Sequence, residues 1–170
     1  MANTYKLIQT VTVGAAGATN IEFSAIPQTY TDLVVLYSIR TNRAAQEVDN
    51  IKISFNGSIT TYTARNLYGN GASAASSTYS TQRGGLAPSA ASTASIFSNT
   101  EIYVPNYTGS TNKSFSVNAI TENNATTSYC EMVAGLWSTT SAITSVGFAP
   151  QDGTLLLQYS SASLYGIKNT

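Results

Sequence analysis

The chain has 170 residues, of which only 9% are charged, and its eight basic and eight acidic residues cancel. This length predicts a single domain, residues 1–170, with a core large enough to need no disulfide or metal to hold it together. The neutral balance argues against nucleic-acid binding, and no apolar run approaches the ~18 residues of a membrane-spanning helix.

The first elements predicted along the chain are two short strands. Residues 5–13 alternate loosely between apolar and polar side chains, so we expect residues 1–10 to form an edge strand or an N-terminal arm. The first ten residues hold no apolar stretch typical of a secretory signal. Ile21, Phe23 and Ala25 are expected to face inward from a second strand, which ends at Pro27 because proline cannot continue a ladder.

Two stronger strands follow and are expected to form the centre of the fold. Residues 33–39 are apolar on both alternating faces, which is typical of a strand covered on both sides. Residues 51–55 alternate strictly and predict a strand with one wet face. Asn56 and Gly57 then predict a tight turn, since both residues adopt a positive φ at low cost.

The middle of the chain has the weakest pattern. Residues 60–68 predict a strand with Tyr62, Ala64 and Asn66 on one face. Residues 72–95 are rich in Ser, Ala and Gly and predict a long loop, because small side chains bury little apolar surface to offset ordering entropy. We leave two interpretations open, a plain surface loop and a loop that becomes ordered against a neighbouring subunit.

The second half again predicts strands, and these complete the fold class. We expect them at residues 96–107, 113–121, 129–138, 142–149 and 155–167. Asp152-Gly153 predicts a hairpin turn between the last two. About eight to ten strands without an amphipathic helix predict an all-β protein, an antiparallel β-sandwich of jelly-roll type.

The side chains favour no catalytic chemistry. The chain has no histidine, which removes the Ser-His-Asp arrangement and the usual zinc sites. Cys130 lies in the middle of a predicted strand, so we expect a buried, inert thiol. Glu47, Asp49 and Asn50 could offer oxygen ligands to calcium, but they lack the spacing of a dedicated loop. We therefore predict no enzyme activity, no cofactor and no metal.

Aromatic and basic residues supply the candidate contacts. Tyr68, Tyr79, Tyr103, Tyr107 and Trp137 suit packing within the chain, a subunit interface or stacking on sugars, and the sequence leaves these three open. Separately, we expect Arg40 to form a structural ion pair with Asp49 or Glu47.

Three blocks of sequence carry a family resemblance. The first comprises I-P-Q-T-Y-T-D-L at 26–33, R-T-N-R at 40–43 and F-N-G at 55–57. The second comprises Tyr62, Arg65 and L-Y-G-N-G at 67–71, followed by the Ser/Ala-rich stretch. The third comprises G-L-W at 135–137, A-I-T-S at 142–145, Q-Y-S at 158–160 and S-L-Y-G-I-K at 163–168. In their order and spacing these blocks resemble small β-rich virion proteins of tailed bacteriophages, many from marine and cyanobacterial hosts.

The resemblance implies a structural protein of the virion, made in the cytoplasm of the bacterial host, with no catalytic residues. The neutral, Tyr-, Ser- and Thr-rich composition favours a capsid decoration (cement) protein, expected to be a homotrimer that contacts the major capsid protein or other virion proteins. The alternative is a tail-fibre or spike component, or a glycan-binding module at the host surface. The residues expected at subunit or capsid contacts are Tyr5, Arg43, Tyr79, Arg83, Leu86, Tyr103 and Tyr107.

Overall fold

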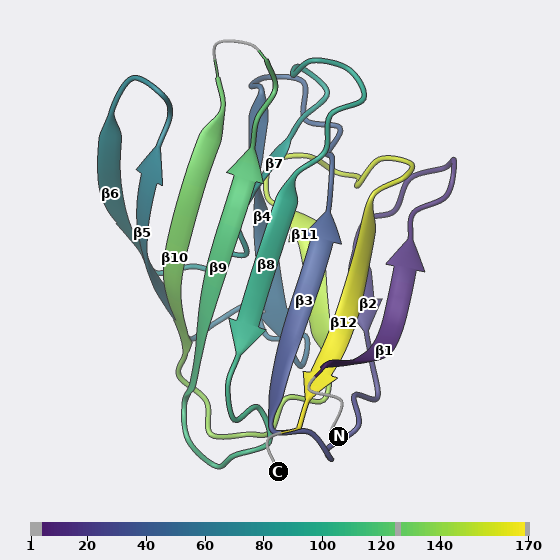
Figure 1. The fold of residues 1–170 in the computed structure, drawn as a ribbon, viewed down its shortest axis with the longest axis vertical. Coiled ribbons are helices and arrows are strands. Elements are labelled where there is room, and N and C mark those ends of the chain that lie inside the picture. Colours follow the sequence, from purple (N-terminus) through teal and green to yellow (C-terminus); the bar gives the residue numbers. More distant parts are fainter. Residues whose placement is uncertain (1–4, 125–126, 169–170) are drawn as a thin grey trace.

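A computed structural model describes residues 5–124 and 127–168 and shows two antiparallel β-sheets packed face to face (Figure 1). Within this part of the chain there are twelve strands and no helix. The expected all-β sandwich is confirmed, and the strands exceed the predicted eight to ten. No helix in the described part is long and apolar enough to cross a membrane.

The larger sheet contains eight strands in the order β1-β12-β3-β8-β9-β10-β5-β6. In that order the strands are Tyr5–Thr12, Ser161–Ile167, Asp32–Ser38, Asn99–Val104, Lys113–Thr121, Tyr129–Trp137, Tyr62–Gly69 and Ala74–Tyr79. β1 lies at one edge of this sheet, and residues 1–4 of the expected arm lie outside the described residues.

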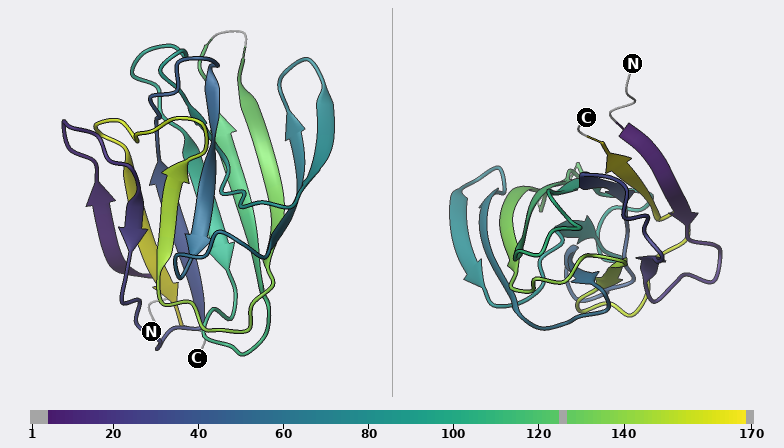
Figure 2. Two further views of the ribbon diagram at one scale, coloured as in Figure 1. Left: turned by 180° about the vertical axis from the view of Figure 1, so that it is seen from behind. Right: turned by 90° about the horizontal axis from the view of Figure 1, so that it is seen from below.

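The smaller sheet contains four strands in the order β2-β11-β4-β7. They are Ile21–Phe23, Val146–Pro150, Val48–Phe55 and Leu86–Pro88. Seen from behind, this sheet covers the middle of the larger one (Figure 2). The chain crosses between the layers repeatedly, since β2, β4, β7 and β11 are separated in sequence by strands of the larger sheet.

The two strands expected at the centre lie in opposite sheets, and both contribute side chains to the core between the sheets. On β4 the alternation is confirmed, because Ile51, Ile53 and Phe55 are fully buried. On β3 the prediction of two covered faces holds only in part. Val34 is 1% exposed, and its cross-strand neighbours on the outer face are Tyr103 and Tyr165, whereas Leu36 is 43% exposed. Tyrosine neighbours, not a third layer, therefore flank the outer side of this strand.

Residues 72–95 do not form the long loop that their composition predicts. They contain β6 and β7, and residues 82–89 are buried without interruption. The physical reason is that the side chains of this segment are small, so its backbone can lie directly against β4. Gly84 N donates to Ile51 O at 2.8 Å, and Ile51 N donates to Gly85 O at 2.9 Å. A Cβ on Gly84 would lie 3.0 Å from Ile51 O, so glycine is needed for this approach.

The two turn predictions have different outcomes. Asn56 and Gly57 have φ of 52° and 68°, and Ser58 N donates to Phe55 O at 2.9 Å, which confirms the tight turn. The hairpin expected at Asp152-Gly153 is wrong, because β11 and β12 lie in different sheets. The last strand also begins later than expected, at Ser161.

Candidate functional site

The two sheets differ in size, so the smaller sheet does not reach across the whole inner face of the larger one, and the segment between β6 and β7 covers part of the remainder. β10, β5 and β6 extend past the edge of the smaller sheet, which ends at β7 (Figures 1 and 2). A small cleft lies at this edge, with a cavity volume of about 170 Å³. Its lining residues come from both sheets and from the segment between β6 and β7: Val48, Asn50, Tyr68, Tyr79, Arg83, Leu86 and Tyr129. We call it the tyrosine cleft.

Three tyrosines form the larger sheet's side of the tyrosine cleft. Tyr68, Tyr79 and Tyr129 share the inner face of β5, β6 and β10, and all three are partly exposed. The rings of Tyr68 and Tyr129 meet edge to face with centroids 5.8 Å apart. Their hydroxyls have no hydrogen-bond partner within the described part of the chain. This wall therefore offers both apolar ring surface and free polar groups.

A buried ion pair lies beside these tyrosines. Arg83 donates from Nε and Nη2 to Glu131 Oε1 at 3.0 and 2.6 Å. The two side chains are 7% and 0% exposed. Asn66 Nδ2 donates to the same oxygen at 2.6 Å. Glu131 lies directly opposite Tyr68 in the strand register, so the pair sits next to the wall of the tyrosine cleft.

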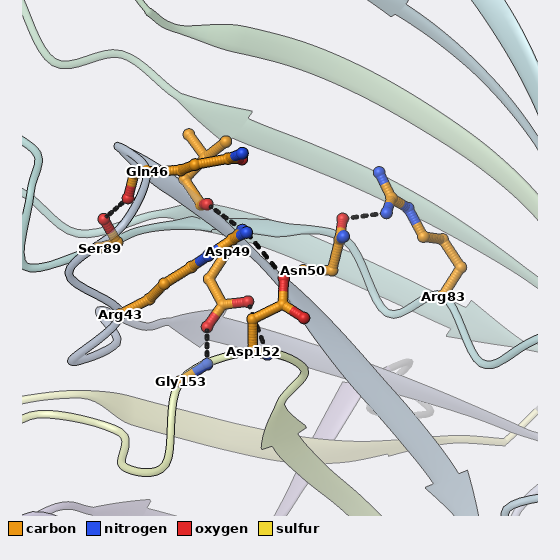
Figure 3. A network of polar contacts seen from close by, with 9 residues as sticks. Arg43, Gln46, Asp49, Asn50, Arg83, Ser89, Asp152 and Gly153 are labelled. Carbon is orange, nitrogen blue, oxygen red and sulfur yellow. Dashed lines mark hydrogen bonds and ion pairs between the residues drawn. The ribbon is translucent and has the colours of Figure 1, made fainter.

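Arg83 also joins the two sheets. Its Nη1 donates to Asn50 Oδ1 on β4, as Figure 3 shows. Its guanidinium lies 4.7 Å from the centre of the Tyr79 ring, a cation–π contact. Two buried oxygens of the network, Glu131 Oε2 and Asn66 Oδ1, have no hydrogen-bond partner in the described residues. The cluster is thus neutral in net charge but incompletely satisfied in hydrogen bonding.

A second polar network fixes the start of β4 next to the tyrosine cleft (Figure 3). Asp49 accepts hydrogen bonds from the backbone nitrogens of Asp152 and Gly153 at 3.2 and 2.9 Å. Arg43 pairs with Asp152 at 3.0 Å and donates to Val48 O at 2.9 Å. The Asp152-Gly153 turn thus supplies amide donors to a buried carboxylate instead of closing a hairpin. No three His, Cys, Asp or Glu side chains of the described residues gather as a metal site.

Arg40 does not form the expected ion pair with Asp49 or Glu47. Its guanidinium donates to the backbone oxygens of Ser92, Thr93 and Ile96 at 2.9, 2.6 and 3.0 Å. Burial lowers the pKa of Arg40 from its ordinary value. These bonds hold residues 92–96 in place, which is a second reason why the expected loop is ordered.

The outer face of the larger sheet is a different kind of surface. Large apolar side chains project from it across the whole width of the sheet, all at least 43% exposed: Tyr5, Leu7, Leu36, Leu67, Ile120 and Met132. Leu67 and Met132 are cross-strand neighbours on β5 and β10. Beside them, a shallow hollow of about 600 Å³ extends over small residues such as Ser116 and Ala134 to Tyr103. We call this surface the outer face.

The structure places the predicted contact residues in four different surroundings. Tyr5 and Tyr103 lie on the outer face, where Tyr103 donates to Asp32 Oδ2 at 2.8 Å. Tyr79, Arg83 and Leu86 meet in the tyrosine cleft, and Arg43 belongs to the network beside it.

Tyr107 differs from all of these, because it is fully buried. Its hydroxyl donates to Pro27 O, and its burial raises its pKa. This corrects the expectation of a subunit contact there, since no surface of Tyr107 is left for a partner.

One further expectation needs correction, because Cys130 is exposed: the inward positions of β10 are those of Glu131 and Val133. For Trp137, where the sequence left three roles open, the structure shows packing within the chain, since this side chain is 3% exposed and its ring stacks on Tyr62 with centroids 6.3 Å apart.

Sequence reasoning did not find Val48 and Tyr129 of the tyrosine cleft, nor Asn66 and Glu131 in the network beside it. It named Asn50 only as a possible calcium ligand. The signal for Glu131 was available, since the alternation of β10 places this acid on the inward side with Val133 and Trp137. An acid at an inward position indicates a buried partner.

Comparison with known proteins returns no relative. No protein-family model, no curated protein and no solved structure matches this chain. Function must therefore be inferred from the two surfaces described above and from the composition of the chain.

Proposed function

We propose that this protein is a non-enzymatic structural protein of a bacteriophage virion, a decoration protein that binds the outside of the capsid. The observation that carries the proposal is the outer face. It presents six large apolar side chains, in a chain of which only 9% of the residues are charged. An extended apolar surface of this kind favours contact with another protein.

A surface of this kind could stabilise a capsid in two ways. A protein that binds one state of a capsid lattice better than another stabilises that state by mass action. Many copies repeated over a shell gain avidity from contacts that are individually weak. We propose a homotrimer as the binding unit and the major capsid protein as its partner, with Tyr5 and Tyr103 among the contact residues on the outer face.

The path of the chain supports the jelly-roll form of the sandwich. From β2 to β12 the chain passes back and forth between the two sheets, and each sheet mixes strands from distant parts of the sequence. Double-sheet jelly rolls occur in viral capsid and lectin domains. Because one fold hosts many functions, this topology adds to the proposal without carrying it.

The first experiment is immunogold electron microscopy with antibody against this protein on intact particles of a phage that carries the gene. We expect label over the heads. Label confined to the tails would replace the decoration role with a tail role, and particles without label would refute a place in the virion.

A second experiment tests the surface. Leu67→Asp and Met132→Asp place a charge at positions that are 56% and 58% exposed, so the fold should tolerate them. We expect both variants to lose binding to capsids. Ile59→Asp is the matched control, because Ile59 is 74% exposed but lies in the connection between β4 and β5, outside the strands that form the outer face. Equal binding by all three variants would show that the outer face is not the contact.

The alternative, a tail-fibre component or a glycan-binding module at the host surface, has one favourable observation. Two of the tyrosines that the sequence offered for stacking on sugars, Tyr68 and Tyr79, lie together in the tyrosine cleft. Immunogold label on the tail would favour this alternative.

A further inference from the structure

We propose that the tyrosine cleft binds one uncharged hexopyranose ring, the terminal or branching sugar of a neutral glycan. This inference concerns a different surface from the outer face. It stands whether the protein sits on the head, on the tail or outside a virion.

The first argument is charge. Among the described residues, Arg83 is the only cation that lines the tyrosine cleft, and its guanidinium donates twice to the fully buried carboxylate of Glu131. An anionic ligand would have to compete with this carboxylate for Arg83, and a cationic ligand would have to compete with Arg83 for a carboxylate that is fully buried. A neutral ligand avoids both penalties.

The second argument is the set of polar groups. The hydroxyls of Tyr68, Tyr79 and Tyr129 have no partner within the described residues, and each can donate and accept. Arg83 has five N–H donors, of which Nε, one on Nη1 and one on Nη2 are used, so two remain. A ring that carries neighbouring hydroxyl groups, each both donor and acceptor, matches this mixture better than a ligand with a single kind of polar group.

The third argument is the aromatic surface. A pyranose has an apolar C–H face, which packs on an aromatic ring, and hydroxyl edges, which need hydrogen bonds. Arg83 already occupies one face of Tyr79 at 4.7 Å. Tyr68 and Tyr129, edge to face at 5.8 Å, offer the remaining ring surface. Apolar contact and polar groups are thus combined within one small site.

The fourth argument is size. The cavity of about 170 Å³ is well below the roughly 300–1,000 Å³ of pockets for drug-sized ligands. It therefore accommodates a single ring, with the rest of a glycan in solvent. Such a small contact predicts a dissociation constant of about 1 mM, which corresponds to roughly −4 kcal/mol.

The test is saturation-transfer NMR on the full chain with matched probes. The neutral probes are glucose, galactose, mannose and N-acetylglucosamine as methyl glycosides. Glucuronate and glucosamine keep a similar ring but carry a negative and a positive charge. We expect millimolar binding of at least one neutral probe and weaker binding of both charged probes. Failure of all four neutral probes, or tighter binding of a charged probe, would overturn the proposal.

Variants locate the binding. Tyr68→Phe and Tyr129→Phe remove one hydroxyl each and keep the ring, so they should fold, and we expect each to weaken binding several-fold. Tyr129→Ala removes the ring and should abolish the signal. Tyr159→Phe is the control, because Tyr159 is 70% exposed and outside the cleft. If the Phe variants bind as tightly as the control, sugar binding at this site is refuted even where sugar binding itself is observed.

Discussion

Replacing the two members of the Arg83–Glu131 pair, singly and together, is the most informative perturbation of this fold. Arg83→Met leaves the carboxylate of Glu131, which is fully buried, without its cation. Glu131→Gln removes the negative charge but keeps an oxygen that can accept the hydrogen bond from Asn66. We expect each single variant to be strongly destabilised and the double variant to regain much of the loss.

The magnitude follows from burial. Breaking a buried ion pair by removing one partner costs about 3–5 kcal/mol, whereas replacing both partners is often close to neutral. A domain of this size loses roughly 2–4 °C of Tm per kcal/mol, so we expect Arg83→Met to unfold about 6–20 °C lower. The coupling energy from the double-mutant cycle should be about 2 kcal/mol or more, well above the ~0.5 kcal/mol within which independent sites add.

The assay is urea unfolding of the wild-type protein and the three variants, followed by tryptophan fluorescence. Trp137 is 3% exposed in the core, so it reports on loss of packing. The pair Arg43–Asp152 provides a matched control, because its side chains are 17% and 41% exposed and such pairs couple by only about 0.2–1 kcal/mol. Equal coupling energies for the two pairs would refute the reasoning from burial.

Three further predictions test other parts of the fold. Gly135→Ala should lower the free energy of unfolding in urea by about 1–3 kcal/mol, because the added Cβ would lie 2.2 Å from the Phe115 ring. Gly14→Ala is the control and should lower it little, because its Cβ would have nothing within 4 Å. Equal losses in the two variants would contradict this reasoning. Burial raises the pKa of Tyr62 from 10 to about 12, so stability that is present below pH 10 should be lost between pH 10 and 12. Tyr62→Phe should flatten this decline, measured as the free energy of unfolding against pH, and an unchanged slope would rule out Tyr62 as its source. Cys130 is exposed and should react with a thiol reagent in the folded protein, so a reaction that requires urea would show that it is buried.

The positions of the strands along the chain were the part of the structure most predictable from the sequence. β9 and β10 fall within one residue of their expected bounds, and their inward positions follow the period of two read from residues such as Phe115 and Val133. Period-two alternation is set by a local property, the pleat of the strand, so a single sequence carries it.

Strand pairing was not predictable in the same way. Asn56-Gly57 forms the tight turn that its chemistry predicts, yet the chain leaves this turn for the other sheet. Asp152-Gly153 looks like a hairpin turn but supplies amide donors to Asp49. Turn chemistry fixes the local path of the backbone, whereas the choice of partner strand depends on contacts between residues far apart in the sequence.

The tyrosine cleft could not be predicted from the sequence, for a related reason. Tyr79 and Arg83 lie in the segment that composition assigned to a loop, and Glu131 lies about fifty positions away on β10. The low content of apolar side chains in this segment predicted a loop without regular structure. Glycine and serine, however, allow a backbone to pack where larger residues cannot. The hydrogen bond of 2.6 Å from Tyr37 Oη to Gly84 O is an example. The same small residues that weakened the strand pattern are thus what brings Arg83 to Glu131 at the sandwich edge. A charged side chain is stable in a protein core only when it is paired with an opposite charge. In a chain with so few charged residues, an acid at an inward strand position therefore predicts a buried basic partner.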